Sequence, residues 1–116
     1  RIALDLSDLR SLVNNDPGVI DDLLQTYLGS AFPACARLPE LVAQGDVAAI
    51  TRIAHTYKSS SRSIGAHRLA DLLAGLERVG HERLLESLPV ETDLVIAEWH
   101  RVFDEIERHH RGRMST

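Results

Sequence analysis

The sequence predicts an all-α domain, an up-and-down antiparallel four-helix bundle with a short extra helix at its N-terminus. Apolar residues recur every three to four positions along several long stretches. No segment of four or more residues alternates with the two-residue period of a strand. Aromatic residues make up only 4% of the chain, so Leu, Ile, Val and Ala must fill the core, which favours helix packing over a sheet.

The composition is that of one ordinary globular domain over residues 1–116. Hydrophobic residues make up 44% and charged residues 26% of the chain. The net charge of −4 argues against nucleic acid as a partner, and no apolar run approaches the ~20 residues of a membrane span. A single cysteine excludes an internal disulfide. We therefore expect a cytoplasmic domain without membrane contact, with a frayed basic tail over residues 108–116.

The first expected helix is short and covers the apolar stripe of residues 4–13. Ser7 is a plausible N-cap, and Asn14 and Asn15 follow the last apolar residue. Such a short amphipathic segment cannot stand alone, so we expect it to cover one end of the bundle.

The second expected helix opens at Asp16-Pro17, a capping residue followed by proline at the first helical position. Its apolar stripe continues to position 42, which makes it the longest periodic stretch of the chain. We expect Pro33 and Pro39 to kink this helix or to split it in two.

Three further helices complete the bundle. Gly45-Asp46 is a stop followed by a new N-cap, and Gly65 separates the next two helices. Residues 80–89 are ambiguous and could hold one helical turn. The helices are expected over residues 47–64, over residues 66–79 and from Thr92 onward.

One histidine of the third helix stands apart from the core. At about 100° per residue the apolar residues share one arc, and His55 lies roughly 150° from its centre. Its neighbours along the helix face, none of them a carboxylate, are Thr51, Arg52, Lys58 and Ser59, with Arg62 one turn further on. Positive charge and hydroxyl donors stabilise a phosphoryl group on an imidazole, which is itself a competent nucleophile near neutral pH. Most exposed histidines on polar faces are nevertheless only solvated side chains.

The sequence around this histidine resembles the signature of the histidine-containing phosphotransfer (HPt) domain family. That signature reads A-H-x-L-K-G/S-S, then x-G-A, a leucine-rich helix and a terminal L-E. The matching residues here are Ala54 to Ser61, Ile64-Gly65-Ala66, Leu69, Leu72, Leu76 and Glu77. Several residue types at fixed spacing across two helices make the resemblance specific.

The resemblance implies a role for individual residues. His55 matches the phosphoacceptor, and Lys58 matches the lysine that steadies the phosphate. Tyr57 departs from the usual Leu at an inward-facing position, which affects packing more than chemistry. The residues expected to meet a docking partner are Thr51, Arg52, Ser59, Arg62 and Gly65.

The resemblance also implies a mechanism and partners. The domain is a phosphorelay intermediate, which accepts a phosphoryl group from a receiver-domain phospho-aspartate and passes it to another receiver. It has no autokinase activity, no cofactor and no metal of its own, because the partner receiver supplies the acidic pocket and its Mg²⁺. A histidine kinase in the same parent chain is a further expected partner, in the cytoplasm or in a membrane-bound hybrid sensor kinase. The starting Arg1, in place of Met, points the same way.

Two alternatives differ in class. The bundle could be a protein-interaction domain whose His55 is never phosphorylated, although an intact His-Lys pair favours the carrier. A metal-binding bundle is the other, since pairs with ligand spacing occur at His100 with Asp104, Glu105 with His109, and Glu107 with His110. No matching carboxylates face inward from the other helices, so surface charge pairing is the better interpretation. The sequence identifies neither the cognate partners nor the direction of phosphate flow.

Overall fold

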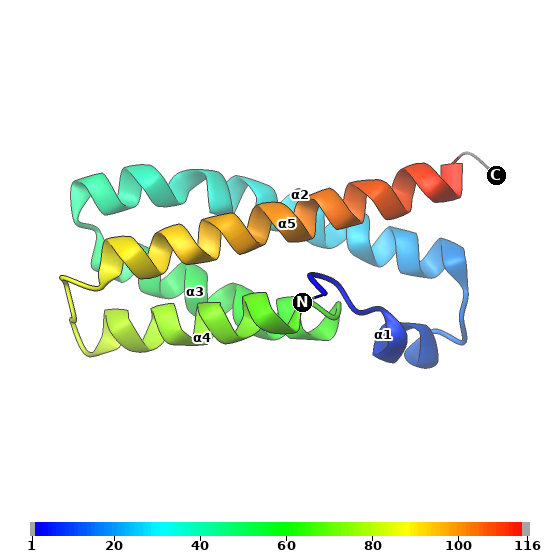
Figure 1. Ribbon diagram of the computed structural model, residues 1–116, viewed down its shortest axis with the longest axis horizontal. Coiled ribbons are helices and arrows are strands. Elements are labelled where there is room, and N and C mark those ends of the chain that lie inside the picture. Colours follow the sequence, from blue (N-terminus) through cyan, green and yellow to red (C-terminus); the bar gives the residue numbers. More distant parts are fainter. Residues whose placement is uncertain (1, 115–116) are drawn as a thin grey trace.

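The structure, a computed structural model, describes residues 2–114 and is helical throughout its regular elements. Within this part of the chain no strand occurs, so the all-α prediction is confirmed. The helices are α1 (Ser7–Leu12), α2 (Pro17–Gln44), α3 (Val47–Ser63), α4 (His67–His81) and α5 (Leu88–Met114). Helices α2 to α5 form an antiparallel bundle (Figure 1).

The four bundle helices have unequal lengths, which leaves space for α1 at one end of the bundle. Helix α2 has 28 residues and α5 has 27, but α3 has 17 and α4 has 15. At about 1.5 Å per residue, the long pair extends beyond the short pair at one end. The short helix α1 lies in the space left beyond the α3–α4 corner (Figure 1). None of the helices within residues 2–114 has both the length and the hydropathy that a membrane span requires.

The core is aliphatic, with a small hydrogen-bonded group at its centre. The Trp99 side chain is fully buried, and its Nε1 donates to the hydroxyl of Tyr27 over 2.8 Å. That hydroxyl lies 2.7 Å from Oγ of Ser61, which is also fully buried. These three side chains come from α5, α2 and α3. Because a buried polar atom without a partner is costly, the network fixes how three helices are rotated against each other.

Helix α2 is continuous, so of the two outcomes expected at its prolines, a kink or a split, the split does not occur. Pro33 and Pro39 both lie inside it, and both are exposed. Each proline removes one backbone donor but keeps its ring on the solvent side. Ala31, Cys35 and Leu38 between and around them are buried, and this packing keeps the helix in one piece.

The N-terminal cap also differs from the expectation. Helix α1 begins at Ser7 rather than being capped by it. Oδ1 of Asp5 accepts from the backbone nitrogen of Ser7 at 3.0 Å and from its hydroxyl at 2.8 Å. Asp5 therefore satisfies one backbone donor of the first turn. The helix ends at Leu12, shortly before Asn14 and Asn15, which adopt φ of 57° and 60°.

Helix α5 is longer than expected at both ends. It begins at Leu88 rather than at Thr92, with Pro89 in its first turn, where a proline disrupts no helical hydrogen bond. It continues to Met114, so residues 108–114, expected as a frayed tail, are helical in the structure, and residues 115–116 lie outside the described part. Nδ1 of His110 lies 3.0 Å from the buried carboxylate of Asp21, which attaches the end of α5 to α2.

Two glycines lie at close approaches: Gly80 where α4 meets α3, and Gly65 where the corner between these helices meets the N-terminal segment. A Cβ on Gly80 would lie 1.9 Å from Oγ1 of Thr51, which itself donates to the carbonyl oxygen of Val47. At the corner between the helices, Gly65 has φ of 96°, and a Cβ there would lie 1.7 Å from the carbonyl oxygen of Asp5. Neither position has room for a side chain, and Gly65 also requires a backbone conformation that other residues avoid.

The Gly80→Ala substitution is expected to destabilise the domain by about 1–3 kcal/mol, because the new methyl group overpacks the α3–α4 contact. A Gly80→Ala/Thr51→Ala double variant should lose less than the sum of the two single losses. Gly29→Ala is the matched control, since a Cβ there meets no atom within 4 Å, and it should be neutral or stabilising by up to ~1 kcal/mol. Urea unfolding measures all four variants, and an unchanged midpoint for Gly80→Ala would contradict the close approach.

Candidate functional site

His55 lies on the solvent side of α3, as predicted. Its side chain is 68% exposed. The rotation of α3 is fixed by residues on its other side: Ser61 binds Tyr27 in the core, and the Tyr57 ring packs 5.5 Å from that of Trp99. Tyr57 follows His55 by two residues, about 200° around the helix. The contacts that hold Tyr57 against the bundle therefore turn His55 outward.

The nearest partner of the imidazole comes from the neighbouring helix. Glu77 of α4 places Oε2 at 2.7 Å from Nδ1 of His55 and Oε1 at 2.6 Å from Nζ of Lys58. The Glu77 side chain is 12% exposed, so its carboxylate lies beneath the two residues that it contacts. One carboxylate thus joins two residues that are one turn apart on α3 to the adjacent helix.

This arrangement determines the charge of Glu77. The hydrogen bond from Lys58 is the main cause that holds its pKa below the ordinary value, and the hydrogen bond from His55 acts in the same direction. Partial burial opposes these effects without outweighing them. Glu77 is therefore ionised at neutral pH.

The charge of Glu77 in turn fixes the tautomer of His55. An ionised carboxylate has no proton to donate and can only accept hydrogen bonds. Nδ1 of His55 must therefore carry the proton of the 2.7 Å hydrogen bond. In the neutral ring, the lone pair then resides on Nε2. The site presents one nucleophilic nitrogen.

A third group lies near the same carboxylate. Nε2 of His81, one turn after Glu77 on α4, is 3.5 Å from Oε2 of Glu77. His81 is as exposed as His55. The surface between the N-terminal half of α3 and the C-terminal end of α4 is hollowed beside these histidines, over about 570 Å³.

The predicted docking residues do not form one continuous surface. Arg52 and Ser59 are exposed on α3 with His55, whereas Thr51 is half-buried against Gly80. Arg62 is exposed and pairs with Asp71 of α4 at 3.2 Å. Gly65 is buried beneath the backbone of Asp5, so its place among docking residues is corrected: it serves the α3–α4 corner.

Glu77 was not predicted as a site residue, although the sequence contained a signal for it. It is the last residue of the L-E pair at the end of the matched motif. The helix that carries His55 contains no carboxylate of its own. A residue of α4 becomes a neighbour only through the packing of two helices.

The other chemical groups of the chain are accounted for by packing. Within residues 2–114, no group of three or more His, Cys, Asp or Glu side chains could hold a metal ion. The His100 ring packs edge-on against Phe103, and Glu105 pairs with Arg108. Cys35 is buried, and burial raises its pKa to about 11, which makes it an unreactive thiol.

The Glu77→Gln substitution is expected to reduce stability near neutral pH, by an amount that shrinks in acid. The folded-state pKa of Glu77 lies below its ordinary value of 4.5. The unfolded chain therefore binds the proton first, and the contribution of the carboxylate is present above the unfolded-state pKa and lost as pH falls through the folded-state value.

Urea unfolding of both proteins between pH 7 and pH 3 measures this difference. Glu82→Gln is the control, because Glu82 is exposed and its pair with Arg78 spans 3.4 Å. An exposed pair contributes little, so its variant should differ little from the parent at every pH. A Glu77→Gln difference that stays constant in acid would contradict the network described here.

Comparison with known proteins identifies the family of the chain. A family model described as "Hpt domain" matches residues 22–109, which include His55, Lys58 and Glu77. No curated protein is similar enough to match the chain. The crystal structure of histidine-containing phosphotransfer protein B (HptB) from Pseudomonas aeruginosa PAO1 is similar, with a TM-score of 0.78 and 24% sequence identity. The match covers 94% of this chain and 96% of that chain, and at this identity it establishes the fold. By the match of the family model, the chain belongs to the Hpt domain family, whose members act in histidine phosphotransfer of two-component phosphorelays.

Proposed function

We propose that this domain carries a phosphoryl group on Nε2 of His55, accepting it from the phospho-aspartate of one receiver domain and passing it to another. The observation that carries the proposal is the hydrogen bond between Nδ1 of His55 and the ionised Glu77. It leaves Nε2 as the free nucleophile on a side chain that is 68% exposed. Such exposure suits a group that must enter the pocket of a second protein.

The transfer step needs only the two proteins and the metal ion of the donor. The lone pair of Nε2 attacks phosphorus, the bond between phosphorus and the aspartyl oxygen breaks, and the donor aspartate leaves as a carboxylate. The Nδ1 proton stays in place, so the phosphorylated ring is a cation. Glu77 stabilises that positive charge, and the same positive charge makes the ring a good leaving group when the next aspartate attacks.

Lys58 is proposed to contact the phosphoryl oxygens. Its Nζ lies 2.6 Å from Glu77, which holds the ammonium group beside the imidazole. Its side chain is 35% exposed, so the ammonium group can also meet an anion arriving from solvent. An ammonium group has three donors, and one of them is used by Glu77.

The partner is proposed to supply what this domain does not. A receiver brings the aspartyl phosphate and the Mg²⁺ that its own carboxylates bind, and we propose no cofactor and no autokinase activity for the domain described here. A histidine kinase, separate or in the same parent chain, would feed the relay. Because such a kinase uses ATP, we propose the cytoplasm as the place of transfer.

The His55→Gln variant is expected to accept no phosphate from any receiver, because it lacks the nucleophile. The experiment mixes the purified domain with a panel of phosphorylated receivers and follows label on the domain. The phosphate should be labile in acid and stable in base. Lys58→Ala should slow the transfer by roughly tenfold, because one charge-assisted contact to the phosphoryl group is lost.

The matched control is Arg108→Ala, an exposed cation on α5. It should transfer at the parental rate. A wild-type domain that binds a receiver and is never labelled would refute the carrier function. The bundle would then act as an interaction domain.

A further inference from the structure

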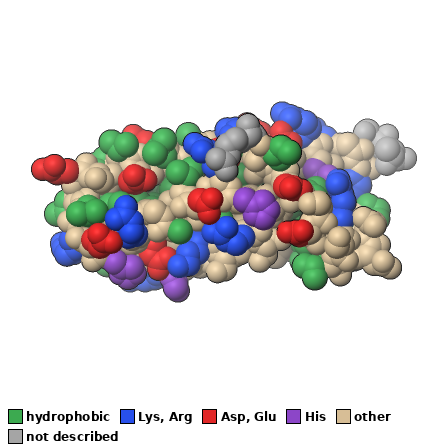
Figure 2. Space-filling view, turned by 60° about the horizontal axis from the view of Figure 1, so that its bottom comes forward, with side chains coloured by type: hydrophobic (Ala, Val, Ile, Leu, Met, Phe, Trp, Pro, Cys, Tyr) green, Lys and Arg blue, Asp and Glu red, His purple; other side chains and the backbone are tan. Residues whose placement is uncertain are grey.

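The hollow beside His55 is more basic than the molecule as a whole. It lies between the start of α3 and the end of α4, and its nine lining residues are Val47, Ala48, Thr51, Arg52, His55, Glu77, Gly80, His81 and Arg83. In Figure 2, histidine and basic side chains are interspersed with acidic ones toward this end of the molecule. The chain carries a net charge of −4, so this concentration of basic groups is a local departure.

The two guanidinium groups of the hollow are available to a partner. Among the ion pairs of residues 2–114, neither Arg52 nor Arg83 is bound to a carboxylate. The one carboxylate of the hollow, Glu77, is already engaged by Lys58 and His55. The positive charge of these arginines is therefore not neutralised within the domain.

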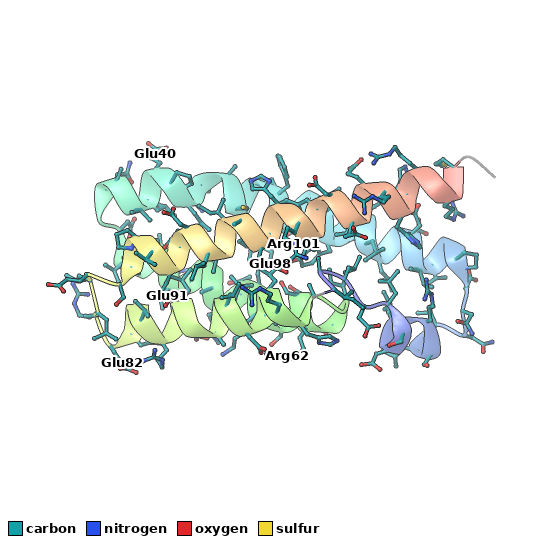
Figure 3. All side chains as sticks on the ribbon, in the orientation of Figure 1. Glu40, Arg62, Glu82, Glu91, Glu98 and Arg101 are labelled. Carbon is teal, nitrogen blue, oxygen red and sulfur yellow. The ribbon has the colours of Figure 1, made fainter. Side chains whose placement is uncertain are left out.

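The opposite side of His55 is different. Arg62, which follows Lys58 along α3, pairs with Asp71 at 3.2 Å. Figure 3 shows Arg62 and Glu82 near opposite ends of α4, and Glu82 directly precedes Arg83. Unpaired positive charge thus lies on one side of the imidazole, which is the property that a docking surface needs to orient an anionic partner.

Arg83 holds its place through an unusual backbone. Its φ is 53°, in the left-handed region, just after the end of α4. Its backbone nitrogen donates to the carbonyl oxygen of Gly80 at 3.2 Å. The backbone nitrogen of Leu84 donates to the carbonyl oxygen of Val79 at 3.0 Å. This pair of hydrogen bonds is the Schellman motif, in which the residue at the Arg83 position is usually glycine. A glycine would suit the backbone better, so arginine is explained by its side chain and not by its conformation.

We infer that Arg83 and Arg52 form the anion-binding edge of the docking surface, and that they receive acidic side chains of the receiver domain next to its phospho-aspartate. This inference rests on the proposed function, because it concerns the partner of the same site. A receiver that brings an aspartyl phosphate and metal-binding carboxylates to Nε2 of His55 is anionic at the point of contact. The screening length is about 8–10 Å in ordinary buffers, so the unpaired arginines of the hollow, and not the net charge of the domain, act on it at close range.

The test measures binding separately from phosphate transfer. The Arg83→Gly and Arg52→Ala substitutions are each introduced into the His55→Gln variant, and the probe is the receiver that binds the parent most tightly in a panel. Calorimetric titration at several salt concentrations gives the dissociation constants. Arg83→Gly removes the charge and restores the residue that the left-handed backbone prefers, so it should fold at least as stably as the parent. Arg78→Ala is the matched control, because Arg78 is exposed on α4 but does not line the hollow.

Each hollow variant should weaken binding roughly three- to tenfold at low salt, and the weakening should fade as salt increases. The control should change binding less than twofold. Unchanged binding by Arg83→Gly, or weakening that is equal at all salt concentrations, would overturn the inference, as would a panel in which no receiver binds. Because His55 is absent from every protein in this titration, its result stands apart from whether the wild-type domain is phosphorylated.

Discussion

A carboxylate buried between two helices needs hydrogen-bond or charged partners. The partners of Glu77 are the two side chains of the functional site. Its two oxygens bind the imidazole of His55 and the ammonium group of Lys58, at 2.7 Å and 2.6 Å. Lys58 keeps the carboxylate ionised, the ionised carboxylate keeps the proton on Nδ1, and that proton leaves the lone pair on Nε2. The chemistry of an exposed histidine thus depends on a residue that solvent hardly reaches. Another buried carboxylate, Glu98 of α5, is paired differently, because Arg101 (Figure 3) and Arg68 both contact its Oε1, at 2.8 Å and 3.4 Å.

The rest of the bundle keeps this contact in register. Glu77 can reach His55 only if α3 and α4 lie close together and neither turns about its own axis. Gly80 allows the close approach, because Thr51 occupies the space that a Cβ would need. The buried pair of Ser61 and Tyr27 fixes the rotation of α3 from its opposite side. Substitutions deep in the core should therefore affect the site through geometry, even where they touch none of its residues.

The sequence was sufficient for the parts of this account that depend on one helix. Periodicity placed α3 within one residue of its observed end and turned His55 to solvent, because both follow from a repeat of 3.6 residues. It failed wherever residues distant in the sequence meet. Glu77 lies 22 positions after His55 and on another helix. Asp21, which binds His110 near the end of α5, lies 89 positions before it. The prolines of α2 follow the same logic: the local rule predicted a kink or a split, and the packing of Ala31, Cys35 and Leu38 keeps the helix in one piece. Arg83 was missed because no pattern predicts arginine at a left-handed position.

The most direct test of the central claim is the identity of the nitrogen that carries the phosphate. The domain is labelled with ¹⁵N in its histidine rings, phosphorylated by a receiver, and held at alkaline pH, where phosphohistidine is stable. The coupling between phosphorus and the two ring nitrogens of His55 is then read by NMR. Phosphate on Nε2 of His55 is the predicted result. Phosphate on Nδ1 would contradict the account, because that nitrogen would then have to be free of Glu77 before transfer.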